Sequence, residues 1–174
     1  MNEIKLSKRL SAAAAMTRDG ASFADIGTDH AYLPIFLLQN GKIKRAYASD
    51  INKGPIENAN ENLKKYGLDG VTVTAVASGL DGIEKIAPTD IAICGMGGEL
   101  IVKILENAPY VRQNHVRLIL QPMTHVELVR EYLQNGFYTV AEKKYHHIID
   151  PDTLFPRDEF ASVSVISGHS PPCQ

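Results

Sequence analysis

The chain has 174 residues, of which 44% are hydrophobic, so it can bury one sizeable core and is not a disordered protein. Its net charge of −2 excludes nucleic-acid binding through overall charge, so any such contact has to come from local basic groups. Two widely spaced cysteines, no signal-peptide core and no apolar run long enough to span a bilayer predict a soluble cytoplasmic protein.

Short apolar runs alternate with helical patterns along the chain, and several helical patterns stop at a glycine. Such alternation predicts an α/β fold with a parallel sheet covered on both faces. The last two strands have no helix between them, so one of them should run antiparallel to the rest. In chain order we expect a helix over 5–16, strand 22–26, helix 30–39, strand 45–49, helix 53–66, strands 71–76 and 90–94, helix 98–107, strand 117–120, helix 125–134, and strands 137–145 and 160–166.

The sequence shows neither an internal repeat nor a linker. We therefore expect one domain over residues 1–167, including the N-terminal helix, followed by a loose tail over residues 168–174. The oligomeric state stays open, with a monomer slightly favoured.

The stretch FADIGTDHAYLP (23–34) begins like the cofactor turn of a nucleotide-binding domain, but its glycine pattern is broken. Asp29 and Ala31 stand where second and third glycines would let the backbone approach a pyrophosphate. A carboxylate at Asp29 opposes a phosphate and suits a cationic ligand. Asp50 follows Gly27 at the spacing of an acid that binds ribose hydroxyls. Together these residues favour S-adenosylmethionine and disfavour NAD.

Each of these features also has an ordinary structural explanation. Asp25 can cap a turn, Asp29 suits a helix N-terminus, and Asp50 can form an Asx turn. The glycines of CGMGG (94–98) can serve only tight packing of a strand against a helix. We favour a ligand site because five segments fall at carboxyl ends of predicted strands, where open α/β sheets bind ligands. They are FADIGTDH (23–30), ASDI (48–51), ASGL (77–80), CGMGG (94–98) and LQPM (120–123).

Several stretches together resemble the bacterial TrmK family. They are KLSKRL (5–10), ADIGTDHAYLP (24–34), the GP-x-x-x-A helix start (54–59), ICGMGGELIVKIL (93–105) and RLILQPMTHVELVREYL (117–133). The resemblance implies a class I S-adenosylmethionine-dependent methyltransferase fold, with a seven-stranded, mostly parallel sheet and one antiparallel strand. It also implies methyl transfer to N1 of adenosine 22 in the D arm of tRNA, which makes tRNA the expected partner.

The resemblance also assigns residues to the cofactor site. A first loop would bind the amino acid part, the end of the second strand the ribose and adenine, and the GMGG stretch would edge the methyl-transfer site. The implied cofactor residues are Arg9, Asp25, Gly27, Asp29, His30, Asp50, Ile51, Ser78, Gly79, Leu80, Gly95, Met96 and Gly97.

Methyl transfer to N1 of adenine mainly requires proximity, and the sequence shows no Ser-His-Asp order and no metal-ligand cluster. We expect Asp29 to stabilise the positive charge that the methylated base gains. Gln121, presented by Pro122, can read an adenine edge, or it can simply bond to backbone. Tyr32 or Met96 can cover the face of an unpaired base, although Tyr32 also suits ordinary helix packing.

Contact with RNA requires positive surface, and the chain offers three local groups of basic residues for it. They are Lys5, Lys8 and Arg9 near the N-terminus, Lys42, Lys44 and Arg45 after the second helix, and Lys143, Lys144, His146 and His147 near the predicted closing hairpin. Solvated surface charge is the ordinary explanation for each group.

Two features depart from the family pattern. Ser78 stands where the family usually has an aspartate, and a hydroxyl accepts a hydrogen bond from the adenine amine more weakly than a carboxylate. The C-terminal helical domain of the family is expected to be absent. Three alternatives stay open: a methyltransferase for another RNA or a small molecule, a non-catalytic binding module, which the two departures favour, and an NAD-dependent oxidoreductase, which Asp29 in the turn disfavours.

Overall fold

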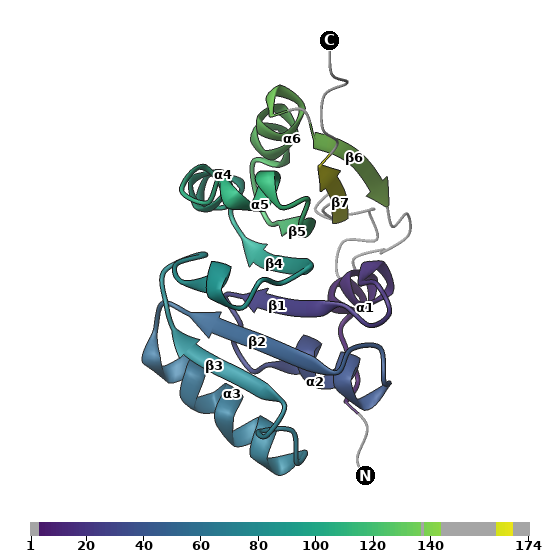
Figure 1. Ribbon diagram of the computed structural model, residues 1–174, viewed down its shortest axis with the longest axis vertical. Coiled ribbons are helices and arrows are strands. Elements are labelled where there is room, and N and C mark those ends of the chain that lie inside the picture. Colours follow the sequence, from purple (N-terminus) through teal and green to yellow (C-terminus); the bar gives the residue numbers. More distant parts are fainter. Residues whose placement is uncertain (1–3, 137, 144–162, 169–174) are drawn as a thin grey trace, which may run out of the picture.

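Strands and helices alternate through a computed structural model that describes residues 4–136, 138–143 and 163–168 (Figure 1). For 138–143 and 163–168 we describe the backbone only. The elements are α1 (Lys8–Met16), β1 (Ser22–Ile26), α2 (Tyr32–Gln39), β2 (Arg45–Asp50), α3 (Lys53–Lys65), β3 (Thr72–Val76), the 3-10 helix η1 (Ile83–Lys85), β4 (Asp90–Met96), α4 (Gly98–Glu106), α5 (Tyr110–Gln113), β5 (Arg117–Pro122), α6 (Val126–Asn135), β6 (Tyr138–Lys143) and β7 (Val163–Gly168).

All seven strands join one sheet in the order β3-β2-β1-β4-β5-β7-β6. Strands β1 to β5 pair in parallel, whereas β7 pairs antiparallel with both β5 and β6. The strand order reverses between β1 and β4, and ligands of open α/β sheets bind at such a point. The predicted class I methyltransferase fold, with one antiparallel strand among seven, is confirmed.

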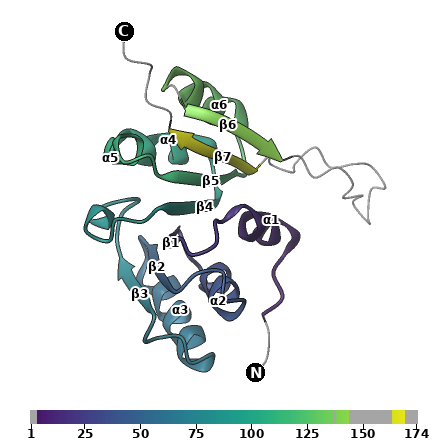
Figure 2. The same ribbon diagram turned by 45° about the vertical axis from the view of Figure 1, so that its right-hand side comes forward.

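Alternate residues of each strand face opposite sides of the sheet. One side of the sheet packs against α4, α5 and α6, and the other side packs against α1 and α2. Helix α3 packs against α2. In Figure 2, α2 and α3 lie beside β1 to β3, whereas α4, α5 and α6 lie with β4 to β7. Buried strand residues on the α4–α6 side include Ala24, Ile26, Ile91, Ile93, Leu118 and Leu120, and those on the α1–α2 side include Phe23, Ala92 and Ile119.

Several boundaries differ from the prediction. The first helix begins at Lys8 because Ser7 is extended and its hydroxyl accepts a hydrogen bond from the backbone N–H of Leu10. The second helix begins at Tyr32 because Ala31 adopts a left-handed conformation, with φ 55°. Strands β4 and β5 each run two residues beyond the predicted end.

The short helices η1 and α5 were not predicted. Parts of the last two predicted strands, at 137, 144–145 and 160–162, lie outside the described residues, as do residues 169–174 of the predicted tail. None of the helices among the described residues has the length and apolar character needed to cross a membrane.

Candidate active site

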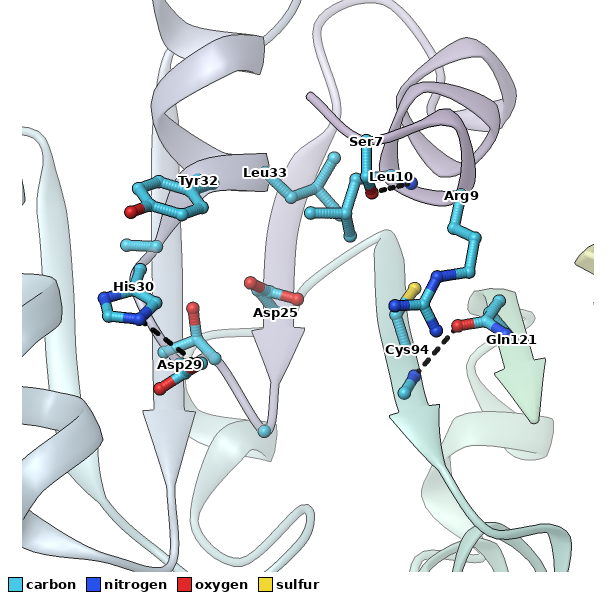
Figure 3. A pocket seen from close by; sticks show the side chains of 14 residues that line it. Ser7, Arg9, Leu10, Asp25, Asp29, His30, Tyr32, Leu33, Cys94 and Gln121 are labelled. Carbon is cyan, nitrogen blue, oxygen red and sulfur yellow. Dashed lines mark hydrogen bonds and ion pairs between the residues drawn. The ribbon is translucent and has the colours of Figure 1, made fainter. Parts of the chain in front are cut away.

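A cavity of about 360 Å³ opens at the carboxyl edge of the sheet (Figure 3). The start of α1, the turn after β1, the start of α2 and the ends of β4 and β5 form its walls. The structure thus joins three of the five predicted segments with the N-terminal region. The predicted residues in its wall are Arg9, Asp25, Gly27, Asp29, His30, Tyr32, Gly95 and Gln121.

Strand alternation explains the polar floor of this cavity. Asp25 pairs with Ala92 in the sheet, and Cys94, two residues later, pairs with Gln121. Asp25, Cys94 and Gln121 therefore point to the same side, the side covered by α1 and α2. Cys94 was not predicted to line the cavity. Its position two residues after Ala92 could have indicated it, because residues two apart on a strand face the same side of the sheet.

The turn after β1 is fixed by its own backbone hydrogen bonds. The N–H groups of Gly27 and Thr28 both donate to the Ser49 carbonyl oxygen, at 2.8 and 2.9 Å. Gly27 has φ 76°, and a side chain there would collide with the Cε of Met96. The positive φ of Gly27 favours glycine, and the N–H groups of Gly27 and Thr28 are already used, so they cannot bind a pyrophosphate.

Asp25 is the buried carboxylate of the cavity, with 7% of its surface exposed. It forms no ion pair within the described ranges. Burial raises the pKa of Asp25 to about 6, and the nearby Thr28 hydroxyl offsets part of that rise. Burial also raises the pKa of the Cys94 thiol, an effect that Asp25 strengthens and Arg9 weakens. The cavity therefore favours a positive group near Asp25.

Asp29 lies at the rim, with 71% of its side chain exposed, and its Oδ2 is 3.2 Å from Nε2 of His30. The His30 ring stacks on Tyr32, with ring centroids 5.0 Å apart and planes at 17°. The left-handed Ala31 between them brings the two rings together. Acid, imidazole and phenol thus form one polar and aromatic edge at the mouth of the cavity.

Gln121 is buried, and its Oε1 accepts a hydrogen bond of 3.1 Å from the Gly95 backbone N–H. Its amide nitrogen lies 3.4 Å from the Pro122 carbonyl oxygen. Of the two predicted alternatives, the structure therefore shows the bond to backbone. The side chain ties the ends of β4 and β5 together beside the cavity, and the adjoining Pro122 is buried.

Arg9 reaches from α1 toward Cys94 and Gln121 (Figure 3). Its Nη1 contacts the sulfur of Met123, in the turn after β5, at 2.6 Å. The Met123 backbone N–H donates to the Met96 carbonyl oxygen at 2.8 Å. Met123 ends LQPM (120–123), one of the five predicted site segments, but it was not predicted as a site residue, because its contact with Arg9 joins residues 114 positions apart.

The remaining predicted cofactor residues lie outside the wall of this cavity. Asp50 follows Ser49, the partner of Ile26 on β1, so it sits beside the Gly27 turn. Its Oδ1 accepts a hydrogen bond of 2.8 Å from the Asn52 N–H, so the alternative Asx turn is present. Ile51 is exposed.

In the segment after β3, Ser78 is exposed, whereas the Leu80 side chain is packed in the core. Any contact of Leu80 with the adenine would therefore come from its backbone, and its predicted place beside the adenine stays a prediction. Gly79 lies against Ile104.

The glycines after β4 have separate roles. Gly95 has φ 84°, which favours glycine. A side chain at Gly98 would collide with the backbone of Thr124 and His125, so that glycine serves tight packing. Gly97 caps α4, and Met96 lies against Gly27.

Two of the three predicted basic groups lie apart in space, and the third lies outside the described residues except for the backbone of Lys143. Lys8 lies between Ser7 and Arg9, which line the cavity, and Lys5 lies two positions before Ser7. Lys42 and Lys44 lie just before β2 and Arg45 is its first residue, so this group lies at the amino edge of the sheet, opposite the cavity. In that group, Lys42 pairs with Asp19 at 3.1 Å, and Lys44 and Arg45 are exposed. No group of three or more potential metal ligands occurs in the part of the chain that the structure describes.

Comparisons with known proteins agree with this architecture. The family model described as a methyltransferase domain matches residues 6–153. The tRNA (adenine(22)-N(1))-methyltransferase of Bacillus subtilis (strain 168) is 41% identical over 143 residues, which make up 82% of this chain and 60% of that relative. The chain thus spans well under two thirds of that relative's length.

Two solved structures are similar over nearly the whole chain. The B. subtilis M1A22 tRNA methyltransferase TrmK is 35% identical with a TM-score of 0.79, covering 97% of this chain and 68% of that one. Streptococcus pneumoniae Sp1610, a proposed tRNA (m1A22) methyltransferase solved with S-adenosyl-L-methionine, is 34% identical with a TM-score of 0.80, covering 97% and 76%. The methyltransferase-domain model matches most of this chain, and the TrmK structure from B. subtilis is 35% identical to it. This chain therefore belongs to the TrmK family of methyltransferases.

Proposed function

We propose that this chain transfers a methyl group from S-adenosylmethionine to N1 of an adenosine in tRNA, at position 22 of the D arm. The observation that carries the proposal is the Gly27 turn. Its N–H groups are bonded to Ser49, and the carboxylates Asp25 and Asp29 lie two residues before and two residues after Gly27 in the wall of the cavity. Such a site suits a nucleoside with a positive centre and opposes a pyrophosphate. Relatives that act on tRNA and bind S-adenosylmethionine support the same assignment.

The cofactor, when bound, supplies a methyl group on a positively charged sulfur. Asp25 would face its cationic part, and Arg9 its carboxylate. Asp50 keeps one carboxylate oxygen outside the Asx turn, and that oxygen would accept from ribose hydroxyls. Ile51 would flank the adenine, and the exposed Ser78 hydroxyl would accept from its amine. Met96 has to move from Gly27 if the cofactor occupies that turn.

Transfer joins the N1 lone pair of adenine to the methyl carbon while the carbon–sulfur bond breaks and its electrons return to sulfur. The chain contributes orientation and exclusion of water. The methylated base carries a positive charge, which a carboxylate stabilises. Asp25 suits this role better than Asp29, because water screens the exposed Asp29 more strongly.

N1 lies on the pairing edge of adenine, so the target base must be unpaired when it enters. The stacked rings of His30 and Tyr32 offer a platform for the face of that base at the cavity mouth. Lys5 and Lys8, beside the same opening, would contact RNA phosphates. Residues 1–167 would act together as one catalytic domain.

The deciding experiment measures transfer of labelled methyl from S-adenosylmethionine to unmodified bacterial tRNA. The matched control is the same tRNA with guanosine at position 22. We expect transfer to the first and none to the second. Equal transfer to both would refute the position, and no transfer despite measured cofactor binding would refute the substrate.

A further inference from the structure

A second cavity, which we call the amino-edge cavity, lies at the opposite edge of the sheet from the candidate active site. Its volume is about 380 Å³, close to that of the first cavity and within the range of ligand-binding pockets. Arg18, which lies between α1 and β1, forms part of its wall, and the other residues precede β4 and β5 or belong to η1 and α5. Its charged and aromatic side chains include Arg18, Glu84 and Tyr110.

Arg18 is held rigidly in the wall of this cavity. Its Nε lies 2.7 Å from Oδ1 of Asp90, its backbone N–H donates to Oδ2 at 2.9 Å, and its Nη2 donates to the Thr89 carbonyl oxygen at 2.6 Å. Asp90 is fully buried, whereas 44% of the Arg18 side chain is exposed. The third guanidinium nitrogen, Nη1, takes no part in these bonds. Arg18 is therefore a hydrogen-bond donor whose position is fixed before any ligand arrives.

The backbone around the amino-edge cavity is strained. Ala87 and His115 have φ of 49° and 53°, and both line the cavity. Left-handed conformations of residues with side chains are energetically unfavourable and gather at functional sites. The Tyr110 hydroxyl adds a second cost, because it is buried without a hydrogen-bond partner among the described residues.

The charges of this cavity favour a base over a phosphate. Arg18 is neutralised by Asp90, and Glu84 adds a further negative charge near Tyr110. A polyanion would therefore be repelled. A planar heterocycle that accepts from Arg18, donates to Glu84 and lies against the Tyr110 ring would satisfy these groups.

We propose that the amino-edge cavity binds a guanine base. Guanine presents the acceptor O6, which can accept from Nη1 of Arg18, and its N1–H and N2–H groups donate to a carboxylate. Adenine carries an amine in place of O6 and would set a donor against Arg18. The base can belong to a free nucleoside or to RNA, and the recognition chemistry is the same. The proposal stands independently of the proposed methyl transfer.

The test is an NMR titration of the full chain with guanosine, compared with adenosine. We expect saturable shifts of the backbone amides at 87–89 and 114–116, with guanosine binding at least tenfold more tightly. Absence of saturable shifts up to about 5 mM guanosine, or shifts confined to residues 27–32, would overturn the proposal.

Glu84→Gln should weaken guanosine binding about tenfold, since a hydrogen bond to a charged acceptor is lost. Asp81→Asn is the matched control, an exposed acid near η1 outside the cavity, and should leave binding unchanged. Equal effects of the two changes would overturn the proposal. Arg18 is unsuitable for this test because its removal leaves Asp90 buried without its ion-pair partner.

Adding unmodified tRNA identifies the source of the base. Displacement of bound guanosine by tRNA would assign the cavity to a base of RNA. Guanosine that stays bound in the presence of tRNA would assign it to a free nucleoside. Both results support a guanine site, and neither depends on methyl transfer.

Discussion

Two buried carboxylates at opposite edges of the sheet have opposite surroundings. Asp90 begins β4, is fully buried, and receives the Arg18 side chain and backbone N–H. Asp25 lies near the end of β1, is 7% exposed, and has no ion-pair partner within the described ranges. Burial without a compensating partner disfavours the charge of Asp25 and raises its pKa to about 6.

The difference separates a carboxylate that stabilises the fold from one that is poised for a ligand. Asp90 gains its compensation from the chain itself. Asp25 would gain it from a cationic ligand, so its burial lowers stability until that ligand arrives. The following variants break or sharpen this contrast.

Arg18→Ala should lower the free energy of unfolding by about 3–4 kcal/mol, because Asp90 keeps its burial and loses its partner. Urea denaturation measures the loss. Lys42→Ala at the same edge is the control, since its pair with exposed Asp19 should contribute less than about 1 kcal/mol. Similar losses in both variants would show that Asp90 is not specially dependent on Arg18.

Asp25→Asn should raise the free energy of unfolding at pH 7 by about 2–3 kcal/mol while weakening cofactor binding. Asp25 releases its proton near the ordinary value of 3.8 in the unfolded chain and near 6 in the folded protein. Between these values the folded state holds more protons, so wild-type stability falls as pH rises. Unfolding curves at pH 4 and pH 7 should therefore show a small difference between the proteins at pH 4 and the full difference at pH 7. A constant difference would contradict the assignment.

Asp50→Ala should weaken binding of S-adenosylhomocysteine by about 2 kcal/mol, through loss of charge-assisted hydrogen bonds to ribose. Calorimetric titration measures the change. Asn52→Ala removes an exposed neighbour whose backbone N–H, not its side chain, meets Asp50, and should leave affinity unchanged. If Asp50→Ala leaves the affinity for S-adenosylhomocysteine unchanged, the role of Asp50 is limited to forming the Asx turn.

Lys5→Gln should have the smallest effect, lowering the salt dependence of tRNA binding by about one phosphate contact. Lys44→Gln, at the amino edge, should leave that dependence unaltered. Binding measured over a series of salt concentrations compares them. An equal decrease in both would extend the RNA-contact surface to the amino edge.

Much of the fold could be predicted because strand and helix periodicities are local properties. The apolar run at 22–26 and the stripe of Ile56, Ala59 and Leu63 each correspond to an observed element. Boundaries were less accurate where backbone geometry overrides pattern, as at Ser7 and the left-handed Ala31. The short helices η1 and α5 carry too few residues for a periodic signal.

The sequence by itself determined the family, the alternation that builds the sheet, and the segments that gather at its carboxyl edge. Only the tertiary structure decided how the side chains there divide their roles. It buried Asp25 and exposed Asp29 within one turn, turned Gln121 onto Gly95, and brought Met123 to Arg9. It also separated Lys44 from the cavity by the length of a strand. Burial and pairing depend on residues distant in sequence, and a local pattern carries no information about them.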